Sequence, residues 1–141
     1  MKLWQKDKAS LKEVETFTVG KDREMDMYLA AFDVLGSLAH IQMLESVGLL
    51  TKDELSKLQK ELKSIYQQIE KGEFRLQDDV EDIHSQVELL LTQKLGDIGK
   101  KIHAARSRND QVLVDIKLFL RNELEELVNA IQPLFELLQT Q

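Results

Sequence analysis

The feature that most constrains this 141-residue chain is a long apolar stripe near its carboxyl-terminal end. Apolar residues recur there every three or four positions, the spacing that places side chains on one face of an α-helix. About thirty helical residues measure roughly 45 Å, more than a compact helical domain of this size needs for its own core. We therefore expect one long helix whose apolar face packs against helices outside this chain. The stripe consists of Val112, Ile116, Leu120, Leu124, Leu127, Ile131, Leu134 and Leu138.

Two features near the end of the stripe bear on how this helix continues. Pro133 lies inside the pattern, and a proline in a helix interior removes one backbone hydrogen bond, so we expect a kink or a missing hydrogen bond there. The sequence then ends at Gln141 without a glycine or a capping residue. A helical pattern that stops without an end signal predicts that the chain is part of a longer protein.

Two shorter helices are predicted in the amino-terminal half. Residues 22–47 carry apolar side chains at helical spacing and are followed by Gly48, a residue type that commonly follows a helix end. Thr51 and Glu54 fit a capping box, which predicts a second amphipathic helix that ends near Gly72. Because the connection between the two helices is short, we expect them to pack as an antiparallel pair.

A third helix is predicted before the long one. Asp78 or Asp79 is expected to cap it, and the glycine-containing segment 96–99 is expected to end it. Residues 1 to about 20 show no sustained period and read as an irregular lead-in. With one proline, six glycines and many helix-favouring Leu, Glu, Lys and Gln residues, the composition agrees with an all-α fold.

Composition also excludes several classes of protein. The chain has no cysteine, which rules out disulfides and thiolate metal sites within it, and a reducing cytoplasmic location is the simplest expectation. The amino terminus lacks the apolar run of a signal peptide, and no segment reads as long and apolar enough to span a bilayer. A net charge of -6 disfavours nonspecific binding to nucleic acid or anionic lipid.

The strongest functional signal lies in residues 103–111, where polar side chains crowd around two alanines just before the apolar stripe. If Ser107 or Asn109 caps the long helix, the first-turn amides point outward beside the guanidiniums of Arg106 and Arg108. Such an arrangement binds a carboxylate or a phosphate, which predicts a site for an anionic small molecule. The alternative is a solvated loop with an ordinary N-cap.

A second candidate lies in the acidic pair Glu81 and Asp82 with His84. An imidazole beside carboxylates at a helix start is able to orient a substrate or move a proton, although an acidic first turn with one polar histidine is the simpler interpretation. His40 reads as a structural residue within an apolar helix. Together with His103, the histidines show no ligand spacing, and most carboxylates read as solvated, so we expect no metal site.

The sequence from Gly99 to Val112, followed by Asp115, resembles the first signature region of the argininosuccinate lyases, a family within the fumarase and aspartase superfamily. Further segments stand where similar segments stand in that family, so the resemblance covers most of the chain. These segments are Asp33, Gly36-Ser37 with Ala39-His40, Gly48-Leu49-Leu50, Gly72-Glu73-Phe74 and Glu81-Asp82-Ile83-His84.

The resemblance implies a helical amino-terminal domain, residues 1–108, that leads into the first long helix of a central bundle, residues 109–141. It implies a homotetramer and the reversible cleavage of argininosuccinate to arginine and fumarate by β-elimination, without a metal or an organic cofactor. It also implies two groups of residues. The substrate-binding residues are Ser107, Arg108, Asn109, Asp82 and His84, and the supporting residues are Arg106, Asp110 and Gln111.

The resemblance also has limits. The family's second and third signature regions, which carry the catalytic groups, lie downstream of Gln141, so no catalytic residue is expected in this chain and the chain alone is expected to be inactive. Asp22 stands where the family usually has a substrate-contacting serine. Two alternatives remain: another lyase of the superfamily, such as adenylosuccinate lyase or fumarase, and a helical assembly module without catalysis.

Overall fold

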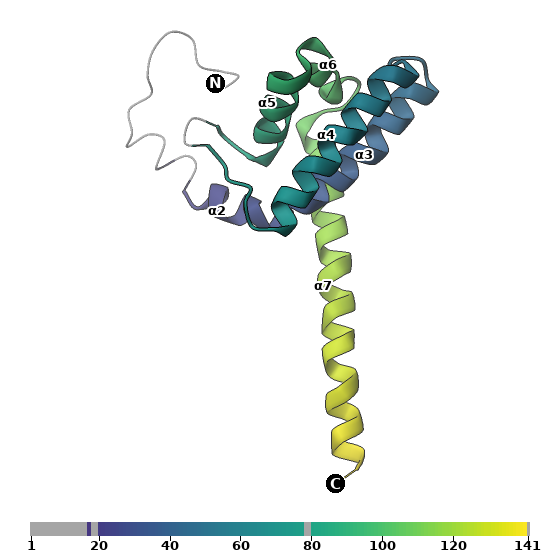
Figure 1. The fold of residues 1–141 in the computed structure, drawn as a ribbon. Coiled ribbons are helices and arrows are strands. Elements are labelled where there is room, and N and C mark those ends of the chain that lie inside the picture. Colours follow the sequence, from purple (N-terminus) through teal and green to yellow (C-terminus); the bar gives the residue numbers. More distant parts are fainter. Residues whose placement is uncertain (1–16, 18–19, 78–79, 141) are drawn as a thin grey trace.

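The computed structural model describes residues 17, 20–77 and 80–140, and these residues form helices and loops without a strand. The all-α prediction is therefore confirmed. Helices α3 to α6 gather into one packed unit, and α7 leaves this unit as a single long rod (Figure 1). The elements are α2 (Asp22–Asp26), η1 (Met27–Leu29), α3 (Ala30–Ser46), α4 (Lys52–Glu70), α5 (Ile83–Leu95), α6 (Asp97–Lys100), η2 (Lys101–His103) and α7 (Arg108–Gln139).

The first predicted helix is divided in the structure. Its expected range becomes the short helix α2, the 3-10 turn η1 and the longer helix α3. The run Asp22–Ser46 is, by length and composition alone, apolar enough to cross a membrane, contrary to the expectation from sequence. In the structure α3 instead packs against α4 and α7 and buries Asp33 and Ser37 among its apolar residues, as the core helix of a folded unit does.

The antiparallel pair of α3 and α4 forms as predicted (Figure 1). Gly48 follows α3 with a φ of 80°, a conformation in which a side chain is strained. Thr51 then begins α4 through the predicted capping box: its hydroxyl accepts from the Glu54 amide, and the Glu54 carboxylate accepts from the Thr51 amide. These two signals fix the turn between the helices.

The predicted cap of the third helix is wrong. Asp78 and Asp79 lie outside the described residues, and the N-cap of α5 is Asp82, whose carboxylate accepts a 2.8 Å hydrogen bond from the Ser85 amide. Sequence pattern could not choose among several aspartates that are all good capping residues. This later start makes Asp82 a structural residue at the opening of the candidate site.

The core lies where α3, α4 and α5 meet. Gly99 in α6 lies so close to α5 that an added Cβ would lie 2.4 Å from the Leu91 backbone carbon. This contact fixes α6 and the following loop against α5, which in turn sets the position at which α7 begins. The buried apolar cluster consists of Ala30, Val34, Ile41, Leu44, Leu50, Leu58, Leu62, Ile65, Phe74, Ile83, Val87, Leu91 and Ile102.

Helix α7 contacts the unit mainly through its first turns. Its two buried residues are polar, Gln111 and Asp115, and both face α3 rather than belonging to the apolar stripe. Slightly further along, the Phe119 ring packs edge to face on Phe32, with centroids 5.9 Å apart. The helix continues through Pro133, where the missing backbone N–H leaves one carbonyl without its usual intrahelical donor.

Candidate functional site

The loop before α7 ends in a strong helix start. Of the two predicted caps, Ser107 is the one used: its hydroxyl accepts from the Asp110 amide, and the Asp110 carboxylate accepts a 3.0 Å hydrogen bond from the Ser107 amide. The hydrogen bonds that the Asp110 carboxylate accepts from the Ser107 amide and hydroxyl lower the pKa of this carboxyl. Ala105, two residues earlier, has a φ of 57°, which is strained for a residue with a side chain. The loop is therefore held in one conformation that directs the neighbouring arginines.

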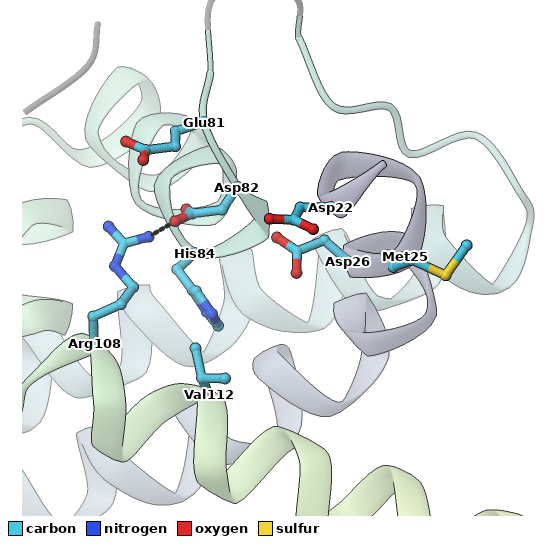
Figure 2. A pocket seen from close by; sticks show the side chains of 8 residues that line it. All are labelled: Asp22, Met25, Asp26, Glu81, Asp82, His84, Arg108 and Val112. Atoms are coloured by element: carbon cyan, nitrogen blue, oxygen red, sulfur yellow. Dashed lines mark hydrogen bonds and ion pairs between the residues drawn. The ribbon is translucent and has the colours of Figure 1, made fainter. Parts of the chain in front are cut away.

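A cavity of about 310 Å³ opens beside this helix start, between α2, the start of α5 and the first turns of α7 (Figure 2). Segments far apart in the sequence thus contribute to one site. Its walls carry four carboxylates, one imidazole and one guanidinium. The lining residues are Asp22, Met25, Asp26, Glu81, Asp82, His84, Arg108 and Val112.

Arg108 supplies the guanidinium of the cavity, and the structure holds it on one side. It donates to the carboxylate of Asp82, and its second terminal nitrogen lies 3.2 Å from the Ser85 hydroxyl (Figure 2 shows the ion pair). A guanidinium has five N–H donors, so these contacts orient Arg108 without using all of its hydrogen-bonding capacity. The α5 cap and the α7 first turn are joined by this ion pair.

The opposite wall of the cavity is acidic. Asp22 and Asp26 project from α2 toward Asp82, as Figure 2 shows. Burial raises the pKa of the Asp26 carboxyl, although this carboxyl also accepts a 3.3 Å hydrogen bond from the Ile83 amide. The two carboxylates of α2 thus form a negative wall across the cavity from Arg108, while Glu81 lies beside Asp82 (Figure 2). A ligand that carries both positive and negative groups fits this distribution of charge.

Behind the cavity lies a buried polar cluster, which we call the Asp33 cluster: Asp33, His84, Gln111 and Asp115. Asp33 Oδ1 lies 2.8 Å from His84 Nδ1 and accepts a 2.6 Å hydrogen bond from the Gln111 amide. Asp115 Oδ2 lies 3.6 Å from the same His84 nitrogen. Both aspartate side chains are fully buried, and together they face one imidazole.

The charges in the Asp33 cluster shift the ionisation of its members. Burial lowers the pKa of His84, but the hydrogen bond and charge of Asp33, with the charges of Asp82 and Asp115, outweigh burial, and the net pKa is raised. Burial, together with the charge of Asp33, raises the pKa of Asp115 to about 7. The carboxylates of the cluster therefore favour the charged form of His84, and near neutral pH Asp115 is partly protonated.

Arg106 completes the balance of charge around the cluster. Its guanidinium donates a 3.0 Å hydrogen bond to the buried Ser37 hydroxyl, and its positive charge acts on Asp33 and Asp115. Among the described residues, Asp33 Oδ2 and both carboxylate oxygens of Asp115 are buried without a hydrogen-bond donor. Two carboxyls, one imidazole and one guanidinium thus share the interior between α3, α5 and α7.

The Asp33 cluster also bears on metal binding. One ligand atom from each of Asp33, His84 and Asp115 lies within 4.8 Å of the others, so the expectation that carboxylates lie on solvated faces is wrong here. Two features oppose a metal cation at this place. The Gln111 amide already donates a hydrogen bond to Asp33, and the positive charge of Arg106 would repel the cation. We therefore interpret the cluster as a hydrogen-bonded charge network.

The structure separates the predicted site residues into two groups. Asp82, His84 and Arg108 line the cavity together. Ser107 and Asn109 are exposed at the start of α7 and are not part of the cavity wall. Among the predicted supporting residues, Arg106 lies half-buried against α3, Gln111 is buried, and Asp110 is exposed within the capping box. His40 is structural as expected, with Nε2 2.8 Å from the Ala104 carbonyl oxygen.

Sequence reasoning missed Asp26 and gave Asp33 and Asp115 no role. A signal for Asp33 was present, because it is a carboxylate within the apolar face of a helix, and such a residue is rarely buried without a partner. Asp115 interrupts the apolar residues of the long helix in the same way. Asp26 gave no comparable signal, since it lies in an ordinary polar stretch.

The fold and the site together define an all-α chain whose longest helix starts at a cavity with opposed acidic and basic walls. Residues 6–141 match the sequence model of a protein family that is described as lyase. This match covers nearly the whole sequence, and the chain belongs to this lyase family.

Several curated proteins are similar to this chain over nearly its whole length. The argininosuccinate lyase of Bacteroides thetaiotaomicron is 61% identical over 97% of this chain. That of Phocaeicola vulgatus is 62% identical over 99% of the chain, and that of Thermotoga neapolitana is 42% identical over 92%. The chain spans 31%, 31% and 33% of the length of these three relatives.

Proposed function

We propose that this chain is the amino-terminal part of an argininosuccinate lyase, which cleaves argininosuccinate to arginine and fumarate by β-elimination. The observation that carries the proposal is the meeting of Asp82, His84 and Arg108 in one cavity, in a chain 61% identical to an enzyme of that name. In this role the cavity binds and orients the substrate, and the catalytic groups come from outside these 141 residues. The chain alone is then inactive.

The charge distribution in the cavity supports this substrate. Argininosuccinate carries carboxylates together with a guanidinium and an amino group, so it needs both an anion-binding and a cation-binding wall. Arg108 is suited to a carboxylate, because its planar guanidinium forms paired charge-assisted hydrogen bonds. Asp22 and Asp26 are suited to the cationic groups. The substrates of fumarase and adenylosuccinate lyase carry no comparable cation, which disfavours these two alternatives.

We also propose that the whole protein assembles as a homotetramer through α7, with Ser107 and Asn109 contacting substrate once neighbouring subunits complete the site. Two observations support assembly. The apolar stripe of α7 is about half exposed, as at Leu127 with 55% of its surface accessible. A mainly apolar groove of about 520 Å³ also lies between α3 and α7. A cytoplasmic role in arginine biosynthesis is part of the same proposal, as is the division into residues 1–108 and 109–141.

A chimaeric enzyme tests the proposal. In the Bacteroides thetaiotaomicron relative, the matching 31% of the chain is replaced by residues 1–141, and fumarate release from argininosuccinate is followed by ultraviolet absorbance. We expect a soluble tetramer with activity, and no activity from the 141-residue chain alone. A soluble, tetrameric chimaera that releases no fumarate would contradict the proposal and would favour a helical assembly module.

Substrate competition separates this lyase from its neighbours in the superfamily. Adenylosuccinate and malate are added at increasing concentration to the same chimaera assay. We expect neither to compete well, because both lack a cation for the acidic wall formed by Asp22 and Asp26. The double variant Asp22→Asn, Asp26→Asn is the matched test: it should weaken argininosuccinate binding and leave the oligomeric state unchanged.

A further inference from the structure

We propose that Asp33 and Asp115 are positioning residues that hold His84 as an imidazolium, so that its Nε2–H serves as a donor to a carboxylate in the cavity. The proposal rests on the proposed function, because it makes His84 a second anion-binding group of the same substrate site. It assigns roles to two buried aspartates that do not line the cavity themselves. The three side chains come from α3, α5 and α7, so the arrangement exists only in the folded unit.

His84 Nδ1 is the ring nitrogen that faces Asp33. Asp33 Oδ1 accepts a 2.6 Å hydrogen bond from the Gln111 amide, and an ionised carboxylate only accepts. At 2.8 Å, His84 Nδ1 must therefore carry a proton and donate to Asp33. This hydrogen bond fixes the orientation of the ring.

His84 Nε2, the other ring nitrogen, is free to contact a ligand. Nε2 has no hydrogen-bond partner among the described residues, and His84 lines the cavity. If the ring were neutral, Nδ1–H would leave Nε2 as an acceptor, which repels a carboxylate. If the ring is charged, Nε2–H is a charge-assisted donor. The protonation of His84 thus decides whether the cavity has one anion-binding group or two.

Charged side chains from several elements surround the His84 ring. Asp33 from α3 and Asp115 from α7 lie 2.8 Å and 3.6 Å from Nδ1. Asp26 from α2 and Asp82 at the α5 cap add negative charge on the cavity side. The cations are Arg106, which acts on the two buried aspartates, and Arg108, which is paired with Asp82. With Asp22 and Glu81, which line the same cavity, these carboxyls outnumber the two guanidiniums and leave the ring in a negative environment that stabilises an imidazolium.

The ionisation of the cluster agrees with this geometry. Although burial lowers the pKa of His84, the surrounding carboxylates raise it on balance. The pKa of Asp115 is raised to about 7 by burial and by the charge of Asp33, so Asp115 is the carboxyl that takes up a proton first. The hydrogen bond and charge of Asp33 are the main causes that raise the pKa of His84, and the charge of Asp115 adds to them as the pH rises.

Nuclear magnetic resonance of the histidine nitrogens tests the proposal without any substrate. The chain contains only three histidines, so the signals of His40 and His103 serve as internal references for His84. At pH 7 we expect both nitrogens of His84 to show protonated shifts, and His40 to show a neutral ring. A neutral His84 ring at pH 7 in the folded parent chain would overturn the proposal.

Two isosteric variants assign the effect to the aspartates. Asp33→Asn removes the carboxyl that lies nearest to His84 Nδ1 and should abolish the imidazolium signal of His84 at pH 7. Asp115→Asn resembles the protonated carboxyl, so it should change the His84 signal little below pH 7 and reduce the imidazolium fraction above it. Asp97→Asn, at an exposed residue paired with Lys100, is the control and should leave His84 unchanged. Folding of each variant is checked by circular dichroism.

Substrate kinetics in the chimaera keep the two proposals apart. Asp33→Asn should raise KM for argininosuccinate by tenfold or more at pH 8, with partial recovery at pH 6, where the ring regains its proton. An active chimaera whose KM is unchanged in Asp33→Asn would overturn the positioning role and leave the lyase function intact. An inactive chimaera with the imidazolium signal present would refute the lyase function, while the ionisation of His84 would stand.

Discussion

The packed helical unit and the protruding part of α7 share one sequence pattern, an apolar stripe at helical spacing, but the stripe is buried in the first and exposed in the second. In α4, the apolar stripe is covered: Leu58 and Leu62 have no accessible surface. In α7, the stripe is open: Leu124 and Leu127 keep 61% and 55% of their surface accessible. Hydrophobic periodicity therefore identifies a helix face that will be buried, but it does not say whether the covering helix belongs to the same chain.

The boundary between the two regions is polar. Where α7 meets α3, its fully buried residues are Gln111 and Asp115, while the Phe119 ring packs on Phe32 and most of the apolar stripe stays exposed. Burying charge costs stability unless it is paired, so this junction contributes less to stability than an apolar contact of the same size would. The cavity and the Asp33 cluster both lie at this junction. The first turns of α7 form one side of each, and the packed unit forms the rest.

The two regions should differ most in the free energy of unfolding that is lost when one leucine in each is replaced by alanine. Leu62→Ala leaves a cavity in the core and should lower the free energy of unfolding by about 3–4 kcal/mol. Leu127→Ala should lower it by less than about 1 kcal/mol in the chain alone, because half of this side chain is already in water. Urea unfolding followed by circular dichroism measures both. Equal losses would show that α7 is covered in solution.

Gly99→Ala tests how tightly the packed unit is built. The new Cβ would lie 2.4 Å from the Leu91 backbone, which cannot move like a flexible side chain, so we expect a loss of about 2–3 kcal/mol. Gly36→Ala is the comparison, since its nearest contact is the Val114 side chain at 3.3 Å. It should cost less than about 1 kcal/mol, because alanine also favours a helix. The same urea unfolding experiment decides between them.

The pH dependence of stability should come from the polar junction. The folded pKa of Asp115 is about 7, above the value near 3.8 of a solvated aspartate, so the folded state holds a proton that the unfolded chain has lost. That stability is present at low pH and is lost as the pH rises through 7. His84 acts in the same direction, because its folded pKa is also raised.

Between pH 6 and pH 8 the free energy of unfolding should therefore fall by about 1.5 kcal/mol. Asp115→Asn should remove most of this fall, whereas the exposed control Asp97→Asn should keep it. Unfolding curves collected at both pH values measure the effect. A parent chain that is more stable at pH 8 than at pH 6 would contradict the assigned ionisation.

The smallest expected effect concerns the helix start itself. Ser107→Ala removes the cap of α7 and should cost about 1 kcal/mol. Asn109→Ala, two residues on and exposed, should change stability by less than about 0.5 kcal/mol. Thermal unfolding of the two variants gives the comparison. A larger loss of stability for Asn109→Ala than for Ser107→Ala would contradict the assignment of Ser107 as the cap of α7.

The sequence predicted the elements of the fold well where local chemistry decides. Local signals predicted the capping box at Thr51 and the glycine after α3 correctly. They narrowed the cap of α7 to two residues, of which Ser107 is the one used. The start of α5 was misplaced because aspartates at several positions satisfy the same rule. The break of the first helix into α2, η1 and α3 had no local signal in the sequence.

The site was predictable only in part, for a different reason. Arg108 and the pair Asp82 and His84 stood out as clusters of polar residues next to apolar helices. Asp33 and Asp115 act through tertiary contacts with residues far away in the sequence, and no spacing rule relates residue 33 to residue 84 or 115. Pairing of that kind becomes visible only when the helices are packed together.

The most direct test of the central claim compares Arg108→Lys with Arg121→Lys in the chimaeric lyase. Arg108 lies in the cavity, whereas Arg121 is an exposed residue of the rod that pairs with Glu125. Lysine keeps the charge but loses the planar pair of donors. We predict that Arg108→Lys lowers kcat/KM for argininosuccinate by about 100-fold, equivalent to about 2.7 kcal/mol, and that Arg121→Lys leaves it within about twofold. Equal, small effects in two well-folded tetramers would contradict the assignment of this cavity as the substrate site.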